Sequence, residues 1–323
     1  MLQDEFSIPN SDTLTKTDIQ SDAHLPEADL SYAILSGADL SAADLSGADL
    51  FHATLSGANL TNADLSDADL TVSNLIRATL SSADLSGAEL TYTDLSDATL
   101  RFSSLLEADL ARATLLRVDL SAADLSGTIA RSADLSGADL SRADFTDADL
   151  SNANLTGTNL TNSDLPNADL SSANLTDADL TDANLMNASL PSANLSDTNL
   201  SDAALAGAEI SDADLSGANL TDADLTGADL MGVDLSNADL MNTNFTSADL
   251  SGTSAIGMDL SKNQFPFTNF TGADLRGSKF TGAKLNGSIL TDADLRGADL
   301  SDADIEGADL TGANLPDGVR DSE

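Results

Sequence analysis

Apolar residues recur at every fifth position from Leu25 to Leu315, which gives about 59 apolar centres along the 323-residue chain. Most centres are Leu. A small residue, usually Ala, stands two positions before each centre, and Asp or Asn stands one position before it. Ser or Thr follows the centre, and the next position is often Gly, Asp or Asn. The repeating unit is therefore A-(D/N)-L-(S/T)-x.

A period of five does not fit a continuous helix or strand. On an α-helix, successive centres would lie about 140° apart and would form no stripe. On a strand, an odd period would turn every second centre to the opposite face. Each unit is therefore predicted to contain its own corner, which small polar residues favour.

The second position after the centre suggests how many sides a coil has. Gly or Asp favours alternate units, as at Gly37, Gly47 and Gly57, whereas the intervening units carry residues such as Ala42 and His52. This ten-residue superperiod predicts turn types that alternate around the coil, and alternation needs an even number of sides. We expect a square coil of 20 residues that stacks on the next coil at strand spacing, about 4.8 Å.

Units such as Ala38-Asp39-Leu40-Ser41-Ala42 resemble those of the pentapeptide-repeat family, and the resemblance covers about nine tenths of the chain. It implies an all-β fold, a right-handed quadrilateral β-helix, in which the central residue and the preceding small residue point inward. We expect one rod and one domain over residues 21–315. Residues 1–20 are predicted to form an N-terminal cap, and residues 316–323 a short polar tail.

Two units depart from the pattern, because each places Ile next to an Ala centre. These are Ile129-Ala130 and Ala255-Ile256. A local bulge could turn the Ile side chains inward. The alternative is a plain Ala gap at the centre that leaves a void, and the sequence leaves both interpretations open.

Composition argues against enzymatic chemistry. The absence of Cys excludes thiolate metal sites and a Cys nucleophile, and two His residues leave little for acid–base catalysis. Asp is so frequent that paired carboxylates identify no active site. We therefore expect no catalytic residue, no metal site and no cofactor. The acidic start and the lack of a long apolar run predict neither a signal peptide nor a membrane span, hence a cytoplasmic protein.

With coils of 20 residues, some outward side chains fall into columns. Tyr32, His52, Val72, Tyr92 and Arg112 share one column, and Phe51 adjoins His52. Clustered exposed apolar residues can mark a contact surface, although scattered ones are ordinary. The candidate protein contact comprises Tyr32, Phe51, His52, Val72 and Tyr92, together with the arginine band from Arg77 to Arg142.

The formal net charge of -41 suggests a second surface. Over the predicted coils it amounts to about one negative charge per 1.8 Å, close to about 1.7 Å for duplex DNA. No Lys or Arg lies between Arg142 and Lys262, and the candidate acidic residues in this stretch are Asp169, Asp179, Asp214, Asp224 and Asp234. Direct nucleic-acid binding is disfavoured by the sign of the charge. Only four Lys and the acid excess resemble salt-adapted, halophilic proteomes.

Two functions follow from these surfaces. The first is a non-enzymatic solenoid that acts as a protein-binding scaffold for an unknown partner. The second is a DNA mimic, because the resemblance implies that some family members bind DNA gyrase or topoisomerase IV, both type II topoisomerases, in place of DNA. Relatives of that kind commonly dimerise through a C-terminal element. The short polar tail here leaves homodimerisation open.

Overall fold

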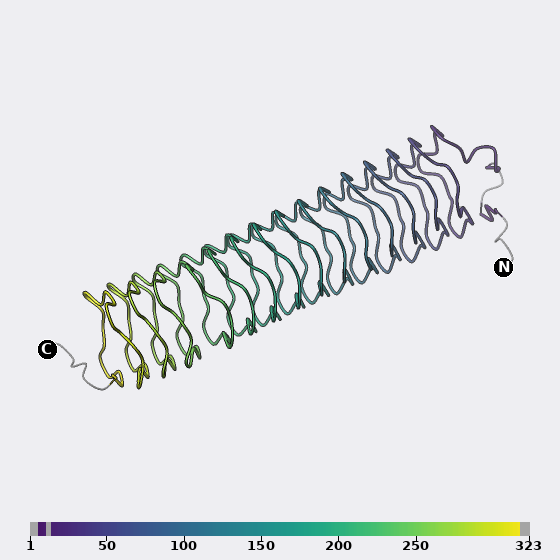
Figure 1. The fold of residues 1–323 in the computed structure, drawn as a ribbon. Coiled ribbons are helices and arrows are strands. Elements are labelled where there is room, and N and C mark those ends of the chain that lie inside the picture. Colours follow the sequence, from purple (N-terminus) through teal and green to yellow (C-terminus); the bar gives the residue numbers. More distant parts are fainter. Residues whose placement is uncertain (1–5, 11–13, 317–323) are drawn as a thin grey trace. The chain divides into compact units, whose positions relative to one another are not determined.

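The fold was analysed in a computed structural model that describes residues 6–10 and 14–316. The described part of the chain contains no helix and no strand of several residues. Each five-residue unit instead contributes one isolated β-bridge and one two-residue turn. The chain divides into two compact units, Met1–Asp164 (unit 1) and Leu165–Glu323 (unit 2), and within each of them the backbone winds through successive coils (Figure 1).

The β-bridges fix the register of the coils. They are parallel and join residues 20 apart, as in Asp44 to Asp64 to Asp84 in unit 1 and Asp214 to Asp234 in unit 2. One residue in every five forms a bridge, and its partner is 20 residues away. Four five-residue units therefore make one turn of the coil. The 20-residue, four-sided coil expected from the sequence is therefore the register observed in both units.

We label the four corners by their turn residues, which recur every 20 positions. Corner A contains 31 and 32, corner B 36 and 37, corner C 41 and 42, and corner D 46 and 47, each with its equivalents in later coils. The faces AB, BC, CD and DA lie between them. Their outward residues are 34, 39, 44 and 49 with their equivalents.

The corners do not alternate in the way that the sequence predicts. The second turn residue has positive φ at consecutive corners, 54° at Ala42 and 61° at Gly47. Both turns also close with the same bond, in which the N–H of Ala43 or Ala48 donates to the carbonyl of the residue three positions earlier, at 3.1 and 3.0 Å. The prediction of alternating turn types is thus not supported, because Gly and Ala at this position adopt the same left-handed conformation.

The core consists of the apolar centres and the small residues two positions before them. Leu centres such as Leu95 and Leu175 are fully buried. Ala130 and Ala255 are 1% and 3% exposed, whereas Ile129 and Ile256 are 37% and 53% exposed. The register therefore continues through both irregular units with Ala at the centre, and no bulge brings Ile inward.

The Asp or Asn before each centre serves the turn that follows. Its Oδ1 accepts the N–H of the residue two positions later, as at Asp64 to Ser66, 3.0 Å, and Asn59 to Thr61, 3.2 Å. Asn also links coils, since the amide of Asn59 donates to Asp39 of the preceding coil at 3.0 Å. An acceptor oxygen is what the turn requires, so either Asp or Asn satisfies it.

The beginning of the chain pairs with the first coil in the opposite direction. Ser7 forms an antiparallel bridge with Ile34, and the side chain of Asn10 donates to Ser31. The predicted cap of residues 1–20 lies partly outside the described residues, at 1–5 and 11–13, and the predicted tail lies outside them from residue 317. In the described chain, no helix has the length and apolarity needed to cross a membrane.

Candidate protein-contact surface

Corner A of unit 1 carries the aromatic side chains that the sequence places in one column. The rings of Tyr32 and His52 stack with centroids 5.3 Å apart, and Phe51 meets Tyr32 edge-on at 5.5 Å. Val72 and Tyr92 continue the same corner in the next two coils. We call these five residues the aromatic strip. The structure brings the first three into direct contact and leaves Tyr32 and Tyr92 about half exposed, at 52% and 53%.

The strip occupies a backbone position that does not suit its residues. Tyr32, His52, Val72 and Tyr92 are all second turn residues with φ between 58° and 61°. Left-handed φ is uncommon for residues other than Gly and is a genuine outlier for bulky or β-branched side chains. Such strain costs on the order of 1–3 kcal/mol per residue and persists where the surrounding structure imposes it. The parallel bridges on both sides of each corner supply that constraint.

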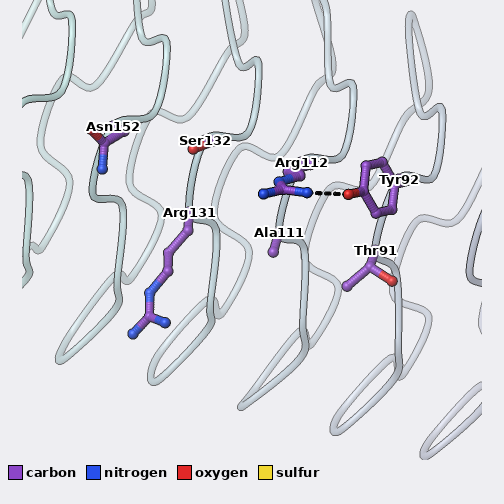
Figure 2. Close-up of a pocket in the computed structure, with 7 residues that line it drawn as sticks. All are labelled: Thr91, Tyr92, Ala111, Arg112, Arg131, Ser132 and Asn152. Atoms are coloured by element: carbon purple, nitrogen blue, oxygen red, sulfur yellow. Dashed lines mark hydrogen bonds between the residues drawn. The ribbon is translucent and has the colours of Figure 1, made fainter.

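A pocket of about 330 Å³ lies on corner A where the strip ends. Its lining comes from four successive coils, and Figure 2 shows these side chains along one corner: Thr91, Tyr92, Ala111, Arg112, Arg131, Ser132 and Asn152. The guanidinium of Arg112 donates to the Tyr92 hydroxyl and lies 5.5 Å from the centroid of its ring. The sequence places Arg112 in this column but gives no sign of the pocket, which depends on side chains that reach across coils.

A smaller depression of about 140 Å³ lies on corner C of the same unit. It is lined by Arg101, Phe102, Arg142 and neighbouring residues, and Arg101 lies 5.6 Å from the ring of Phe102. Both hollows therefore combine an exposed aromatic ring with two arginines. The arginine band predicted from Arg77 to Arg142 is thus distributed over three corners, because Arg77 and Arg117 lie on corner B.

The five candidate acidic residues do not form one patch. Asp214 and Asp234 are successive members of face AB. The other three lie on different faces: Asp169 on DA, Asp179 on BC and Asp224 on CD. All five accept the turn N–H two residues ahead, and the hydrogen bonds from Ser236 hold the pKa of Asp234 below its ordinary value. Negative charge consequently surrounds the coil instead of marking one side.

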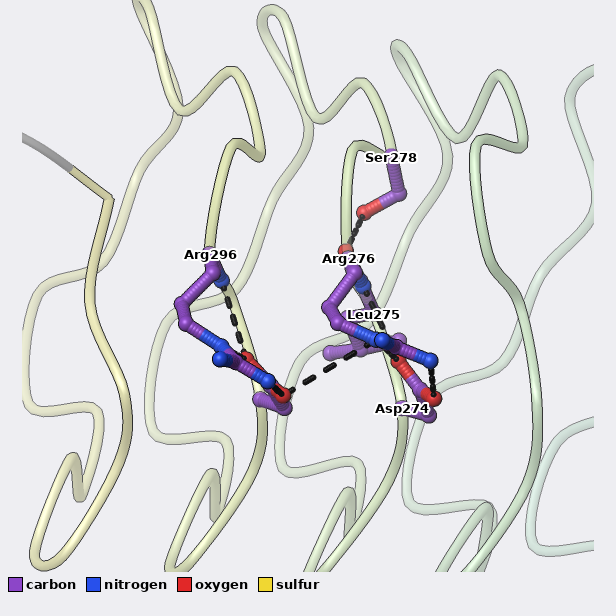
Figure 3. Close-up of polar contacts among 6 residues, drawn as sticks. Asp274, Leu275, Arg276, Ser278 and Arg296 are labelled. Atoms are coloured by element: carbon purple, nitrogen blue, oxygen red, sulfur yellow. Dashed lines mark hydrogen bonds and ion pairs between the residues drawn. The ribbon is translucent and has the colours of Figure 1, made fainter.

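Two arginines of unit 2 bind the carboxylates of face AB (Figure 3). Arg276 contacts Asp274 through Nη2 at 2.6 Å, and Arg296 contacts Asp294 in the same way at 2.5 Å. The Nε of Arg276 also lies 3.8 Å from Asp294. The hydrogen bonds from Arg296 lower the pKa of Asp294 from 3.8 to about 2, so these pairs hold neighbouring carboxylates in the ionised form.

Metal-binding chemistry has no candidate in the described part of the chain. No group of three or more His, Cys, Asp or Glu side chains converges there in a way that could hold a metal ion. His24 contacts Asp44 at 2.7 Å on the surface, and His52 stacks on Tyr32.

The comparison with family models identifies the repeat. The model for pentapeptide repeats matches segments that together run from residue 21 to residue 315. The chain belongs to the pentapeptide-repeat family. The match leaves only short segments at the two ends, so membership extends through both units.

Solved structures of the same family are similar to this chain. HetL, a pentapeptide-repeat protein involved in heterocyst differentiation regulation from the cyanobacterium Nostoc sp. strain PCC 7120, is 32% identical, with 76% of this chain and 92% of HetL covered and a TM-score of 0.21. Full-length QnrB1, a plasmid-mediated fluoroquinolone resistance protein, is 20% identical, with 63% and 94% covered and a TM-score of 0.34. No curated protein matches the sequence significantly.

Proposed function

We propose that the protein is a non-enzymatic scaffold that binds a protein partner through the aromatic strip of unit 1. The framework would be the right-handed quadrilateral β-helix that the sequence predicts. The observation that carries the proposal is the placement of Tyr32, His52, Val72 and Tyr92 at left-handed turn positions along one corner. Gly, Asp or Asn would occupy these positions with less strain and would serve the coil equally well.

The chemistry of the strip suits protein recognition. Tyr and His present an apolar ring together with a polar group, and exposed aromatic side chains are enriched among residues that dominate protein interfaces. Val72 adds an apolar contact, 37% exposed, between the two Tyr residues in the column. The contacts among Tyr32, Phe51 and His52 hold these rings in place before binding. A partner would therefore meet a surface that has little side-chain freedom left to lose.

Affinity capture with matched variants tests this proposal. The strip variant combines Tyr32→Ser, His52→Asn, Val72→Asn and Tyr92→Ser. The control removes exposed apolar side chains of unit 2 through Met186→Ser, Met231→Ser and Met241→Ser, residues that are 43% to 58% exposed. We expect a protein that the wild type and the control retain and that the strip variant loses. With that protein purified, the affinity should fall at least tenfold in the strip variant only. A captured set that is the same for all three proteins would refute the proposal.

The second candidate function is that of a DNA mimic for a type II topoisomerase. Residues 165–261 of unit 2 contain sixteen acidic and no basic residues. They span just under five coils, and at about 4.8 Å per coil this gives one negative charge about every 1.5 Å. Duplex DNA carries one charge per about 1.7 Å. A basic groove built for DNA would attract such a surface over a long range.

Neutralising part of this surface separates the two functions. The variant carries Asn at Asp169, Asp179, Asp214, Asp224 and Asp234. Asn keeps the acceptor oxygen that the turns use, as Asn194 does for Ser196 at 3.0 Å, so the coils should survive. If the protein mimics DNA, the wild type should alter supercoiling by a purified type II topoisomerase, and the effect should weaken with salt and in the variant. Supercoiling that the wild type leaves unchanged would exclude the mimic and would not bear on the strip.

A further inference from the structure

The pocket at the end of the aromatic strip is lined by two arginines, although the chain as a whole is strongly acidic. Arg112 and Arg131 enter it from successive coils of corner A. In the part of the chain that the structure describes, no carboxylate lies within ion-pair distance of Arg112, whose guanidinium contacts Tyr92 instead. Arg131 uses its Nε to contact Asp149, and this leaves four of its five N–H donors on the two terminal amino groups.

On each of the two faces beside the pocket, an uncharged residue interrupts the acidic column. On face AB, Thr114 stands between Asp94 and Asp134 in the bridged column. On face DA, Ile129 stands between Asp109 and Asp149. Asp109 and Asp134 border the same corner, so each arginine lies next to one uncharged and one acidic face residue. In a chain with a net charge of -41, two arginines therefore line one pocket.

The remaining lining supplies neutral hydrogen-bond donors. The Tyr92 hydroxyl accepts the bond from Arg112 and so keeps its own hydrogen for a ligand. Ser132 and Asn152 add a hydroxyl and an amide from two different coils, whereas the hydroxyl of Thr91 donates to Thr71 at 3.5 Å. This set of donors exceeds what the two oxygens of a carboxylate would use. It suits the three acceptor oxygens and the charge of about −1.5 to −2 of a phosphate monoester.

We propose that the corner A pocket of unit 1 binds a phosphoryl group between Arg112 and Arg131, with the hydroxyl of Tyr92 as a further donor. The ligand is a phosphate monoester, carried by a phosphorylated side chain or by a small molecule. Arginine is the side chain best suited to bind phosphate oxygens in two-point fashion. The inference does not depend on the scaffold function, because phosphate binding can be measured with this protein alone.

The sequence provides an optical probe for the test. The chain has two Tyr residues and no Trp, so Tyr32→Phe leaves Tyr92 as its only Tyr fluorophore. In this background, Tyr92 emission is titrated with inorganic phosphate against sodium chloride of equal ionic strength. We expect a saturable change with phosphate alone. Amide NMR shifts of Ala111 and Ser132 should follow the same binding curve. A response that is equal in phosphate and chloride would overturn the proposal.

Matched arginine variants locate the binding. Arg112→Gln and Arg131→Gln should each weaken phosphate binding at least tenfold. Arg77→Gln is the control, because Arg77 is also a second turn residue with φ of 59°, like Arg112, but it lies on corner B. It removes the same charge and should change the affinity less than threefold. Circular dichroism and thermal melting confirm that the variants fold. Equal losses in all three variants would overturn the proposal, since they would indicate a general charge effect.

Peptides without Tyr or Trp separate the sources of the phosphoryl group. A phosphoserine peptide that binds at least tenfold more tightly than inorganic phosphate would support a phosphorylated partner. Equal affinities would support a small phosphate ligand. The same peptide with Glu in place of phosphoserine should bind at least tenfold more weakly than the phosphopeptide. If the Glu peptide binds as tightly, the pocket recognises carboxylate and the phosphoryl assignment is wrong.

Discussion

Units 1 and 2 share the same five-residue repeat and have nearly equal net charges, and they differ clearly at the second turn residue. Each unit of the sequence contains 27 acidic residues, with seven basic residues in unit 1 and six in unit 2. The second turn residue is Gly, Asp or Asn at 25 of 30 corners in unit 2, but at only 14 of 29 corners in unit 1. Tyr, His, Val, Phe and Arg occupy many of the others in unit 1, although φ is positive at all of them.

This difference distinguishes the positions that the coil requires for its stability from the position that can vary on the surface. The centre, the small residue and the Asp or Asn are set by burial and by the turn hydrogen bond, and they are similar in both units. The second turn residue points outward, and Gly or Asn would satisfy its backbone best. Bulky residues there lower the stability of the coil, so their clustering in unit 1 indicates a role outside the fold.

Substitutions in the core should have the largest effect on the free energy of unfolding, and this effect should be the same in both units. Leu95→Asp in unit 1 and Leu175→Asp in unit 2 each bury an unpaired carboxylate at a fully buried centre. Each should lower the free energy of unfolding by several kcal/mol. The outward control, Asp179→Ser, should cost much less. Chemical denaturation measures all three, and comparable losses for Leu175→Asp and Asp179→Ser would contradict the assigned register.

A smaller effect of opposite sign is expected at Asn263 in unit 2. This residue occupies an Ala position and is 1% exposed, and among the described residues neither polar atom of its amide has a hydrogen-bond partner. Asn263→Ala should therefore raise the free energy of unfolding by about 1–3 kcal/mol.

Thr243, one coil earlier in the same column, is the matched control for Asn263. Its hydroxyl donates to the carbonyl of Leu220 at 2.9 Å. Thr243→Ala removes that bond and should lower the free energy of unfolding by about 1 kcal/mol. A stabilising Thr243→Ala, or a destabilising Asn263→Ala, would show that hydrogen bonding does not decide the outcome at this position.

The sequence predicts the coil well and the surface less well, for physical reasons. The period of five determines burial, because each centre has one inward direction available. The 20-residue register was predicted from the ten-residue superperiod, and it is observed although the turn types do not alternate. The period of five could not decide between Ile129 and Ala130, since that choice depends on whether the bridges continue through the unit. The predicted alternation of turns was wrong because Ala42 and other non-Gly residues accept the left-handed conformation that Gly47 adopts freely.

The surface sites depend on the directions that side chains take across neighbouring coils, and the 20-residue spacing of the sequence does not give these directions. The contact between Tyr32 and His52 follows from the register and could be predicted. The pocket could not, because Arg112 turns back toward Tyr92 and Arg131 reaches forward to Asp149. The five candidate acidic residues are close together in the sequence. Most of them are not separated by a multiple of 20 residues, so they lie on different faces of the coil.

Strain at the second turn residue should appear as opposite effects in the two units. Val72→Asn in unit 1 replaces a β-branched residue at φ of 61° and should raise the free energy of unfolding by about 1 kcal/mol. Gly227→Ala in unit 2 introduces a Cβ at φ of 67°. Apart from its two chain neighbours, no described residue has an atom within 4 Å of this Cβ, so the variant should lower the free energy of unfolding by about 1 kcal/mol through backbone strain alone. Thermal and denaturant unfolding measure both. Two changes of the same sign would indicate that strain does not distinguish the units.

The smallest effect concerns the carboxylates that unit 2 pairs with arginine. Arg296→Gln removes the main hydrogen bonds to Asp294, so the pKa of Asp294 should rise from about 2 toward its ordinary 3.8, less the effect of the remaining Arg276. A lowered folded-state pKa stabilises the fold above the ordinary pKa, and this contribution is lost as the pH falls through the folded-state value. The wild type should therefore lose this contribution progressively between about pH 3.8 and pH 2, whereas the variant should have less of it to lose. Carboxyl carbon NMR of Asp294 follows the titration directly. Asp39 of unit 1 is the control, because hydrogen bonds from Ser41, and no arginine, hold its pKa below the ordinary value. Its pKa should not change in the variant. A shift at Asp39, or none at Asp294, would contradict a local ion pair.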